Sequence, residues 1–263
     1  MTNPRNKSSQ ASAGSGGTGV WATLAAQVLR QSPLVQQLDA ASGVGTAGGV
    51  GEAVVSALVA MGSYKALAVE QTYQQHGDPV PQVCVVLSGY LLVGLVDALG
   101  KVHIVRPLGA GQLFNMLPVL DGGSAIHDAR AGPETALWLM PGAQFVQLMQ
   151  RVPAFGAAIH TLLYARNRQL YQELADMALL PLRQRCARII LQVMEDLRPP
   201  GSAQPDWCVS VSQSELADML GYTRPIVNKE LRRLADEGLI RITYRQIAVV
   251  DAGLLQRVAT DSV

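Results

Sequence analysis

Four basic residues lie close together near the carboxyl end of the chain and could recognise an anionic polymer. They are Arg224, Lys229, Arg232 and Arg233, and Glu230 is the one acidic residue among them, so four cations face one carboxylate. The whole 263-residue chain, in contrast, has a formal net charge of only +1. A guanidinium can donate two parallel hydrogen bonds to guanine, and a focused patch suits docking in one register. The patch therefore favours sequence-specific DNA binding over general nucleic-acid coating.

The residues around this patch predict two short helices joined by a tight turn. Ser212 and Glu215 have the spacing of a capping box, which would start the first helix. Gly221 can take the positive φ of the turn, while Thr223 and Pro225 suit the start of the second helix. Apolar side chains at helical spacing would pack the helices together: Leu216, Met219 and Leu220 on the first, and Ile226, Val227, Leu231 and Leu234 on the second. The alternative is an ordinary helical hairpin with a solvated basic face, and the agreement of caps, turn and charge disfavours it.

A β-hairpin is predicted directly after the second helix. Gly238 would end the helix, and β-branched residues then form two runs on either side of Tyr244 and Arg245. Together with the two helices this gives a winged helix-turn-helix, whose second helix fits the major groove of DNA.

Each candidate DNA contact has an expected role. The side chains at the helix starts would hold the phosphate backbone; these are Ser212, Gln213, Ser214 and Thr223. Arg224 would donate to O6 and N7 of guanine. Asn228 and Lys229 would reach base edges or phosphates, and Arg245 at the wing tip would reach a phosphate.

The part of the chain before this region reads mainly as β-structure. Apolar, β-branched runs at 83–87, 90–96, 102–105 and 136–140 are separated by glycine, proline and aspartate turns, which indicates a compact roll or barrel. The glycine-rich run 43–51 lacks the strand, helix and lysine of a phosphate-binding loop, and we interpret it as a flexible loop.

The chain resembles the cyclic-AMP receptor protein/fumarate-nitrate regulator superfamily of bacterial transcription factors. The resemblance is carried by Ser212-Gln213-Ser214-Glu215-Leu216-Ala217, Gly221, Thr223-Arg224, Val227-Asn228-Lys229-Glu230-Leu231, Leu234 and Glu237-Gly238-Leu239-Ile240. It implies an α+β fold with an N-terminal cyclic-nucleotide-binding-like β-roll, a long dimerisation helix and a C-terminal winged helix-turn-helix. Relatives often carry a base-reading glutamate after the arginine; Pro225 stands there in this chain, which implies a different base preference.

The resemblance extends to the effector domain, where this chain departs from the family pattern. Family members that bind cyclic AMP carry a Gly-Glu pair and then an Arg-Ser or Arg-Thr pair. Here Asn115-Met116 replaces the first pair, and Ala125-Ile126-His127 occupies the neighbourhood of the second. A buried cyclic phosphate needs charge-assisted partners. We therefore expect that cyclic AMP is not the effector; His127, if protonated, could still serve another nucleotide.

A long helix is predicted between the two domains. From Pro153 to about Leu180, apolar residues follow alternating three- and four-residue steps, interrupted by Arg166 and Glu173. The resemblance implies that this helix pairs two chains and covers the effector pocket, where Arg166 and Glu173 would pair across the dimer or contact a ligand. Packing on its own roll is the alternative. The predicted organisation is a disordered tail 1–19, a β-roll 20–150, a dimerisation helix 151–180 and a DNA-binding domain 181–263.

Composition and spacing argue against other classes of protein. Three separated cysteines, none before residue 84, fit a reducing cytoplasm and disfavour a disulfide framework or an iron–sulfur cluster. The four histidines do not have the spacing of metal ligands. The sequence also lacks a paired nucleophile and base that would indicate an enzyme. Haem ligation by His76, His103 or Cys84 stays open. No targeting or membrane-spanning segment is expected.

A protein-interaction module is the alternative function. Activation would require a surface for RNA polymerase, which the sequence does not locate.

Overall fold

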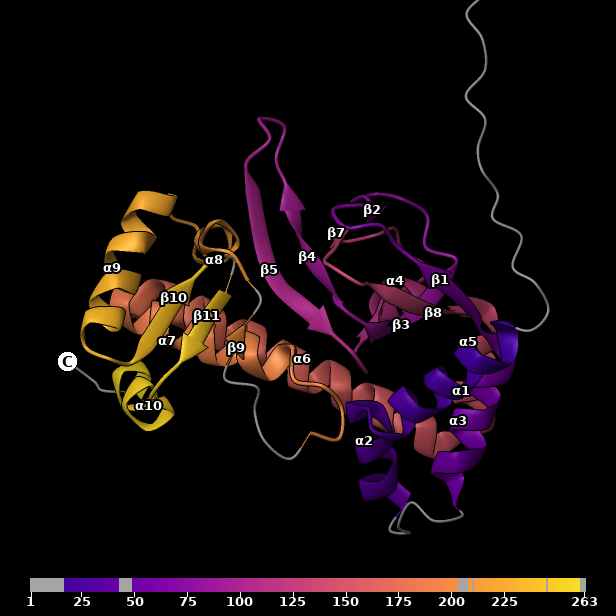
Figure 1. Cartoon of the computed structure of the whole chain (residues 1–263). Helices are drawn as coiled ribbons and strands as arrows, with labels where there is room; N and C mark the ends of the chain where they lie inside the picture. Colours follow the sequence, from indigo (N-terminus) through magenta and orange to yellow (C-terminus); the bar gives the residue numbers. More distant parts are fainter. Residues whose placement is uncertain (1–16, 43–48, 203–207, 210, 245, 261–263) are drawn as a thin grey trace, which may run out of the picture.

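The computed structural model describes residues 17–42, 49–202, 208–209, 211–244 and 246–260. Two lobes lie at opposite ends of a long helix, α6 (Pro153–Leu179). In Figure 1 the N-terminal helices and the β-strands surround one end of α6, and the C-terminal helices gather at its other end. The fold is α+β, with an N-terminal roll, a long helix and a C-terminal helix-turn-helix, as the sequence predicts.

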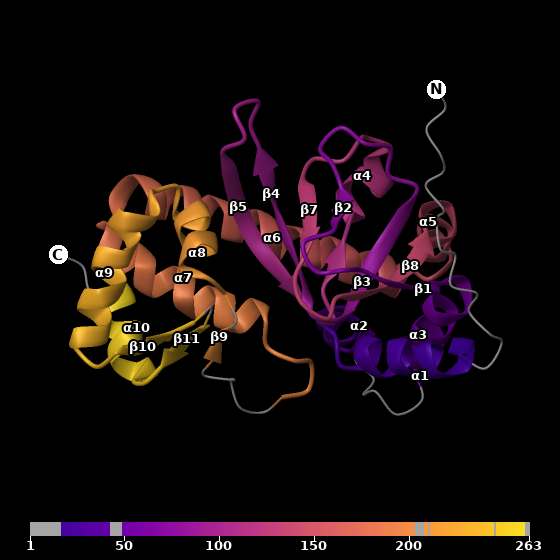
Figure 2. The same cartoon turned by 45° about the horizontal axis from the view of Figure 1, so that its top comes forward.

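In the part of the chain that the structure describes, three helices precede the first strand, and this corrects the prediction that residues 20–150 are mainly β. They are α1 (Gly17–Arg30), α2 (Pro33–Ser42) and α3 (Val50–Met61). Ala25, Val28 and Leu29 repeat at helical spacing and are buried, as are Val54, Val55 and Leu58 of α3. These helices pack beneath the roll (Figure 2), where they share a hydrophobic cluster with strands of one sheet.

The predictions at the N-terminus are only partly tested. Helix α1 already begins at Gly17, so the described end of the predicted tail is helical. The predicted loop at 43–51 is wrong for Val50 and Gly51, which belong to α3, whereas residues 43–48 lie outside the described part of the chain. The predicted domain boundaries stay predictions.

The roll consists of two four-stranded antiparallel sheets. One has the order β1-β8-β3-β6 and the other the order β2-β7-β4-β5. The predicted strands are confirmed as β3 (Gln82–Ser88), β4 (Tyr90–Val96), β5 (Val102–Gly109) and β8 (Ala136–Pro141). The structure adds four short strands: β1 (Ser63–Ala66), β2 (Thr72–Gln74), β6 (Leu113–Phe114) and β7 (Asp128–Ala131). Each of them is at most four residues long, which is too short to show a clear alternation.

Buried side chains from both sheets fill the interior of the roll. Cys84, Val86, Leu91, Leu108 and Leu137 belong to one cluster there. The turn between β3 and β4 depends on Gly89, which has φ +61°. A Cβ at this position would lie 2.4 Å from the carbonyl oxygen of Pro133, so the close approach of these two turns requires glycine.

The long helix α6 follows α4 (Met116–Asp121) and α5 (Gly142–Arg151). Its first turns are buried against the roll and α2 through Phe155, Ala158 and Ile159. From Tyr164 onwards, in contrast, the helix exposes apolar side chains, namely Tyr164, Leu170, Tyr171, Leu174, Met177 and Leu179, which we call the α6 stripe. Pro181 then separates α6 from α7 (Leu182–Asp196), as predicted.

The C-terminal lobe contains the predicted helix-turn-helix and wing. Its elements are β9 (Cys208–Val209), α8 (Gln213–Leu220), α9 (Arg224–Asp236), β10 (Ile240–Thr243), β11 (Gln246–Val249) and α10 (Ala252–Thr260). Strand β9 pairs with β11, so the wing has three strands where two were predicted. The hydrophobic cluster of this lobe also includes Tyr90, Leu92 and Ile104 of the roll, so the two lobes share a packed interface.

Candidate nucleic-acid interface

Helix α8 begins and ends as its sequence predicts. The Ser212 Oγ accepts a hydrogen bond from the Glu215 backbone N–H at 3.1 Å, and the Glu215 carboxylate accepts one from the Ser212 N–H at 2.7 Å. Gly221 closes the helix with φ +74°. This complete capping box satisfies backbone donors at both positions and holds the start of α8 in a defined orientation. Its inner residues Leu216 and Met219 are buried, as expected.

Helix α9 presents a basic outer face and an apolar inner face. Val227, Leu231 and Leu234 are fully buried, whereas Arg224, Lys229 and Arg232 are exposed. Ile226 was predicted to belong to the buried stripe, but 47% of its surface is exposed. It lies one residue, about 100° of helical rotation, from Val227, which carries it out of the packed face.

The cations of α9 are available for an external anion. Within the described residues, Arg224, Lys229 and Arg232 form no ion pair, whereas Arg233 donates to Glu230 at 2.8 Å, one turn earlier. Asn228 is half-buried, and its Oδ1 is enclosed without a hydrogen-bond partner in this part of the chain. Three unpaired cations on one exposed helix face can contact phosphates or base edges.

The predicted phosphate contacts lie beside this face. Ser214 and Thr223 are exposed, while Ser212 and Gln213 are half-buried at the start of α8. Thr223 occupies the N-cap position of α9, yet its side chain makes no capping hydrogen bond, which leaves the hydroxyl able to meet a phosphate. Pro225 is exposed in the first turn of α9, as predicted.

The turn between α8 and α9 has a support that the sequence analysis missed. The Arg185 guanidinium of α7 donates to the carbonyl oxygen of Leu220 at 2.9 Å, and it lies 5.4 Å from the centre of the Tyr222 ring. Arg185 is buried and thereby holds the end of α8 against α7. A single arginine in an amphipathic helix gives no sequence signal for such a role.

The wing contains a hairpin in which β10 pairs with β11. Ile240 pairs with Val249 and Thr243 with Gln246, and Tyr244 is in the turn that follows Thr243. Tyr244 is almost fully exposed. The predicted phosphate contact Arg245 lies outside the described residues.

The candidate effector residues do not form one open site. Asn115 and Gln74 are both buried and exchange two amide hydrogen bonds, of 3.1 and 2.6 Å. The Met116 side chain is buried in the cluster shared with the N-terminal helices, and Ala125 is buried as well. Ile126, in contrast, is exposed. The self-paired amides and the buried methionine offer no charge to a nucleotide.

The other two candidate effector residues, His127 and Glu173, are partly buried, and burial shifts the pKa of each. Burial, followed by the charges of Arg166 and His76, lowers the pKa of His127, so this side chain is neutral at pH 7. The lowered pKa disfavours a protonated His127, and its contribution to a nucleotide site stays a prediction. Glu173 accepts a hydrogen bond from Gln169 at 3.0 Å, and burial raises the pKa of its carboxyl.

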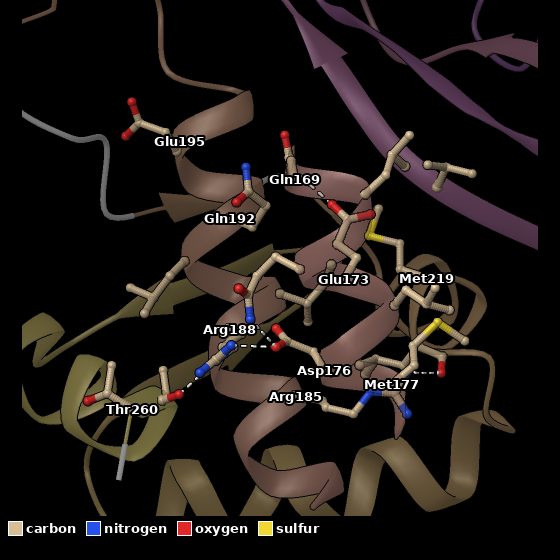
Figure 3. Close-up of a pocket in the computed structure, with 18 of the residues that line it drawn as sticks. Gln169, Glu173, Asp176, Met177, Arg185, Arg188, Gln192, Glu195, Met219 and Thr260 are labelled. Carbon is tan, nitrogen blue, oxygen red and sulfur yellow. Dashed lines mark hydrogen bonds and ion pairs between the residues drawn. The ribbon is translucent and has the colours of Figure 1, made fainter. Parts of the chain in front are cut away.

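Glu173 lines a cavity at the bend between α6 and α7, which we call the elbow pocket. It has a volume of about 550 Å³. Figure 3 shows Asp176 and Glu173 of α6 facing Arg188 and Gln192 of α7. Arg188 forms an ion pair with Asp176. Leu170, Leu174 and Met177 line the pocket and also belong to the α6 stripe, so the pocket opens onto an apolar surface.

The described residues were also compared with what a metal site and a membrane-spanning helix require. In the part of the chain that the structure describes, no group of three histidine, cysteine or acidic residues is arranged to hold a metal ion. No described helix has both the length and the apolar character that crossing a membrane requires. Cys84 and Cys186 are buried thiols, and burial raises the pKa of each to about 12.

Comparisons with known proteins agree with this architecture. The family model of the cyclic nucleotide-binding domain matches residues 65–152, and that of the Crp-like helix-turn-helix domain matches residues 184–258. The cyclic AMP receptor protein of Thermus thermophilus is 27% identical over 183 residues, which cover 70% of this chain and 82% of that protein. A CRP-like cAMP-activated global transcriptional regulator of Mycobacterium tuberculosis is 23% identical over 181 residues, 69% of this chain and 81% of that protein.

The fold is also that of solved regulators. The structure of FixK2 from Bradyrhizobium japonicum matches with a TM-score of 0.68 at 16% identity, over 77% of this chain and 99% of that chain. The two family models match the roll and the helix-turn-helix lobe. The chain therefore belongs to the cyclic-AMP receptor protein/fumarate-nitrate regulator superfamily and is a DNA-binding transcription regulator.

Proposed function

We propose that the protein acts in the cytoplasm as a homodimer that recognises an approximate inverted repeat in DNA. The observation that carries this proposal is the outer face of α9, where Arg224, Lys229 and Arg232 are exposed without ion pairs among the described residues. A helix of this kind, held by a preceding capped helix, fits the major groove. The inverted repeat follows from the two-fold symmetry of a homodimer.

The α6 stripe supports the homodimer. Six large apolar or aromatic side chains from Tyr164 to Leu179 are exposed in the single chain. A second copy, related by two-fold symmetry, would cover the same stripe with its own and would also close the mouth of the elbow pocket. The two α9 helices would then enter successive major grooves about 34 Å apart, one turn of DNA.

The side chains on and beside α9 would divide the recognition. Arg224 lies at the first position of the helix and would donate to guanine, while Lys229 and Asn228 would contact bases or phosphates one turn further along. Ser212, Gln213, Ser214 and Thr223 would contact the backbone and so set the register. Arg245 at the wing tip would add a phosphate contact, and Pro225 would leave one base without a direct polar contact.

We further propose that cyclic AMP does not control this protein, although the curated relatives from Thermus and Mycobacterium are named for cyclic AMP. The segment that would hold the cyclic phosphate and ribose offers a self-paired Asn115, a buried Met116, an exposed Ile126 and a neutral His127. An anion removed from water requires charge-assisted hydrogen bonds, which these side chains do not supply. A calorimetric titration should give no saturable heat with cyclic AMP, and tight binding would contradict this part of the proposal.

The DNA-binding proposal is tested by selecting bound duplexes from a random pool and titrating the best sequence at two salt concentrations. An inverted repeat should emerge. With six to ten phosphate contacts, affinity should fall by a factor of about 10³–10⁵ between 50 and 200 mM salt. A protein-interaction module that does not bind DNA would enrich no sequence and show no such dependence.

A further inference from the structure

The turn between α1 and α2 lies where three distant segments of the chain meet, at a contact that we call the junction. Its residues are Gln31 and Ser32 of this turn, Gly111 of the turn from β5 to β6, and Pro200 and Gly201 after α7. Helices α1 to α3 all lie before residue 65, where the match to the cyclic nucleotide-binding family model begins. The junction thus connects helices outside that model to the lobe that carries the helix-turn-helix.

Pro200 packs against Gly111 and lies beside Ser32. Gly111 has φ +81°, and a Cβ built there would lie 2.9 Å from Cγ of Pro200 and 3.4 Å from Cα of Ser32. The proline ring therefore occupies the space that a side chain at position 111 would need. Ser32 is fully buried, and its Oγ donates to the carbonyl oxygen of Leu29 at 2.6 Å, which fixes the turn from α1 to α2.

The segment that carries Pro200 is a tight turn. The backbone N–H of Ser202 donates to the carbonyl oxygen of Pro199 at 3.2 Å, and Gly201 has φ +77°. Proline followed by a glycine with positive φ is typical of the two central positions of a type II turn. A Cβ built at Gly201 would lie 2.8 Å from Cδ of Gln31. The glutamine side chain therefore covers this turn from the N-terminal side.

A cavity lies beside the junction. Its volume is about 560 Å³, and it is lined by Gln27 and Val28 of α1 and also by Leu197 and Arg198 at the end of α7. Part of the boundary between α1 and the end of α7 is therefore not filled by side chains. The close contacts of the junction consequently have a larger share in holding these two segments together.

We propose that the junction is a positioning contact for DNA binding, through which the N-terminal helices hold the C-terminal lobe in one position relative to α6. Helix α2 packs against α6, so the junction ties the end of α7 to the helix that would pair two chains. The N-terminal helices and α9 lie at opposite ends of α6 (Figure 1), so the junction leaves the exposed face of α9 uncovered. This inference rests on the proposed DNA-binding function.

The junction would set the distance between the two α9 helices of the homodimer. A lobe that is already held in position loses less conformational freedom when it binds. Binding to a single half-site needs only one α9 helix, whereas an operator with two half-sites also needs the correct spacing. Loosening the junction should therefore lower the ratio of operator affinity to half-site affinity by a factor of about three to ten.

Two substitutions in the full-length protein loosen the junction, and each has a control. Gly111→Ala places a methyl group against Pro200. Gly100→Ala places the same group at a glycine with nearly the same φ, +80°, where the surrounding space is open. Gln31→Ala removes the side chain that covers the turn after α7, and Gln75→Ala removes an exposed glutamine of the roll. Fluorescence anisotropy measures the affinity for the selected operator and for one of its halves.

Gly111→Ala and Gln31→Ala should lower the ratio of the two affinities, while both controls should keep the native value. Adding Pro200→Ala to Gly111→Ala should restore the ratio, because it removes the Cγ from the place that the new methyl group takes. An unchanged ratio in Gly111→Ala or in Gln31→Ala, or no recovery in the double variant, would overturn the positioning contact.

Amide hydrogen exchange tests the junction without DNA. The backbone N–H groups of Leu197 and Ser202 donate to the carbonyl oxygens of Val193 and Pro199. Both should exchange faster in Gly111→Ala and in Gln31→Ala than in the two controls, because local opening becomes easier. Exchange at the control rate would contradict the proposal. Faster exchange in a protein for which no DNA sequence can be selected would support the contact and contradict only the DNA-binding function.

Discussion

Arg224 occupies the first position of α9, where its exposed side chain is closest to the turn. Because it forms no ion pair in the described structure, replacing it should not disturb the fold. Arg224→Ala should weaken binding to the selected operator by about 1–3 kcal/mol and relax the preference at one base pair. Fluorescence anisotropy with single-base operator variants measures both effects. Arg151→Ala, which alters an exposed arginine of α5, should change neither. Unchanged affinity and preference in Arg224→Ala would contradict the proposed docking.

His127 should make the stability of the protein depend on pH. Its pKa in the folded state is lowered from the ordinary 6.5, first by burial and then by Arg166 and His76, while Asp128 opposes the shift. Below pH 6.5 the unfolded chain therefore binds a proton that the folded chain does not, and stability falls as the pH falls towards the folded pKa. The slope for one such proton is at most about 1.4 kcal/mol per pH unit.

Urea unfolding of the native protein and His127→Gln between pH 7.5 and 5 tests this dependence. His127→Gln should lose stability less steeply as the pH falls. If the slope of His127→Gln equals that of the native protein, His127 is not the group responsible.

At the scale of the element, α6 has two parts with different partners. Its first turns are buried by the N-terminal helices and the roll, while from Tyr164 onwards it carries the α6 stripe. Leu174→Glu places a charge in the middle of that stripe and should convert the proposed homodimer to a monomer, because a carboxylate at an apolar interface is costly to desolvate. Sedimentation velocity measures the change, and affinity for a two-half-site operator should fall with it.

Arg151→Glu is the control for this substitution. It also introduces a glutamate at an exposed position, but on α5 and not among the residues of the α6 stripe. It should leave the dimer intact. A Leu174→Glu protein that still sediments as a dimer would show that the chains associate through another surface.

At the scale of the whole molecule, the two lobes are joined by a buried ion pair. Arg106 of the roll contacts Asp196, which is 4% exposed, and Gln112 donates to the carbonyl oxygen of Asp196 at 2.9 Å. Burial raises the pKa of Asp196, while the attraction of Arg106 opposes that shift. Removing the arginine would leave a buried carboxylate without its countercharge.

Arg106→Met should therefore lower the free energy of unfolding by about 3–5 kcal/mol. Chemical denaturation measures this loss. The double substitution Arg106→Met with Asp196→Leu should recover much of it, because an apolar pair of similar volume carries no desolvation cost. If the single substitution costs no more than an exposed replacement such as Arg151→Met, the ion pair does not hold the lobes together.

The local patterns of the sequence predict several elements and their ends. The capping box at Ser212, the turn at Gly221 and the break at Pro181 lie where predicted, since each depends on contacts within a few residues. The four longest strands of the roll are also confirmed. The N-terminal helices were missed, although α1 carries apolar residues at helical spacing, because the β-rich segments that follow dominated the interpretation.

Local patterns were enough to predict the class of fold, the family and the basic face of α9, because periodicity, caps and charge depend on residues that are close together in the chain. Tertiary structure decided which side chains are available: Ile226 is exposed, Met116 is buried, and Asn115 pairs with Gln74, 41 residues away. It also brought Arg106 to Asp196, 90 residues later, and left Arg166 without an acidic partner among the described residues. The physical reason is that burial and charge pairing depend on which distant segments meet, and no local pattern specifies that meeting.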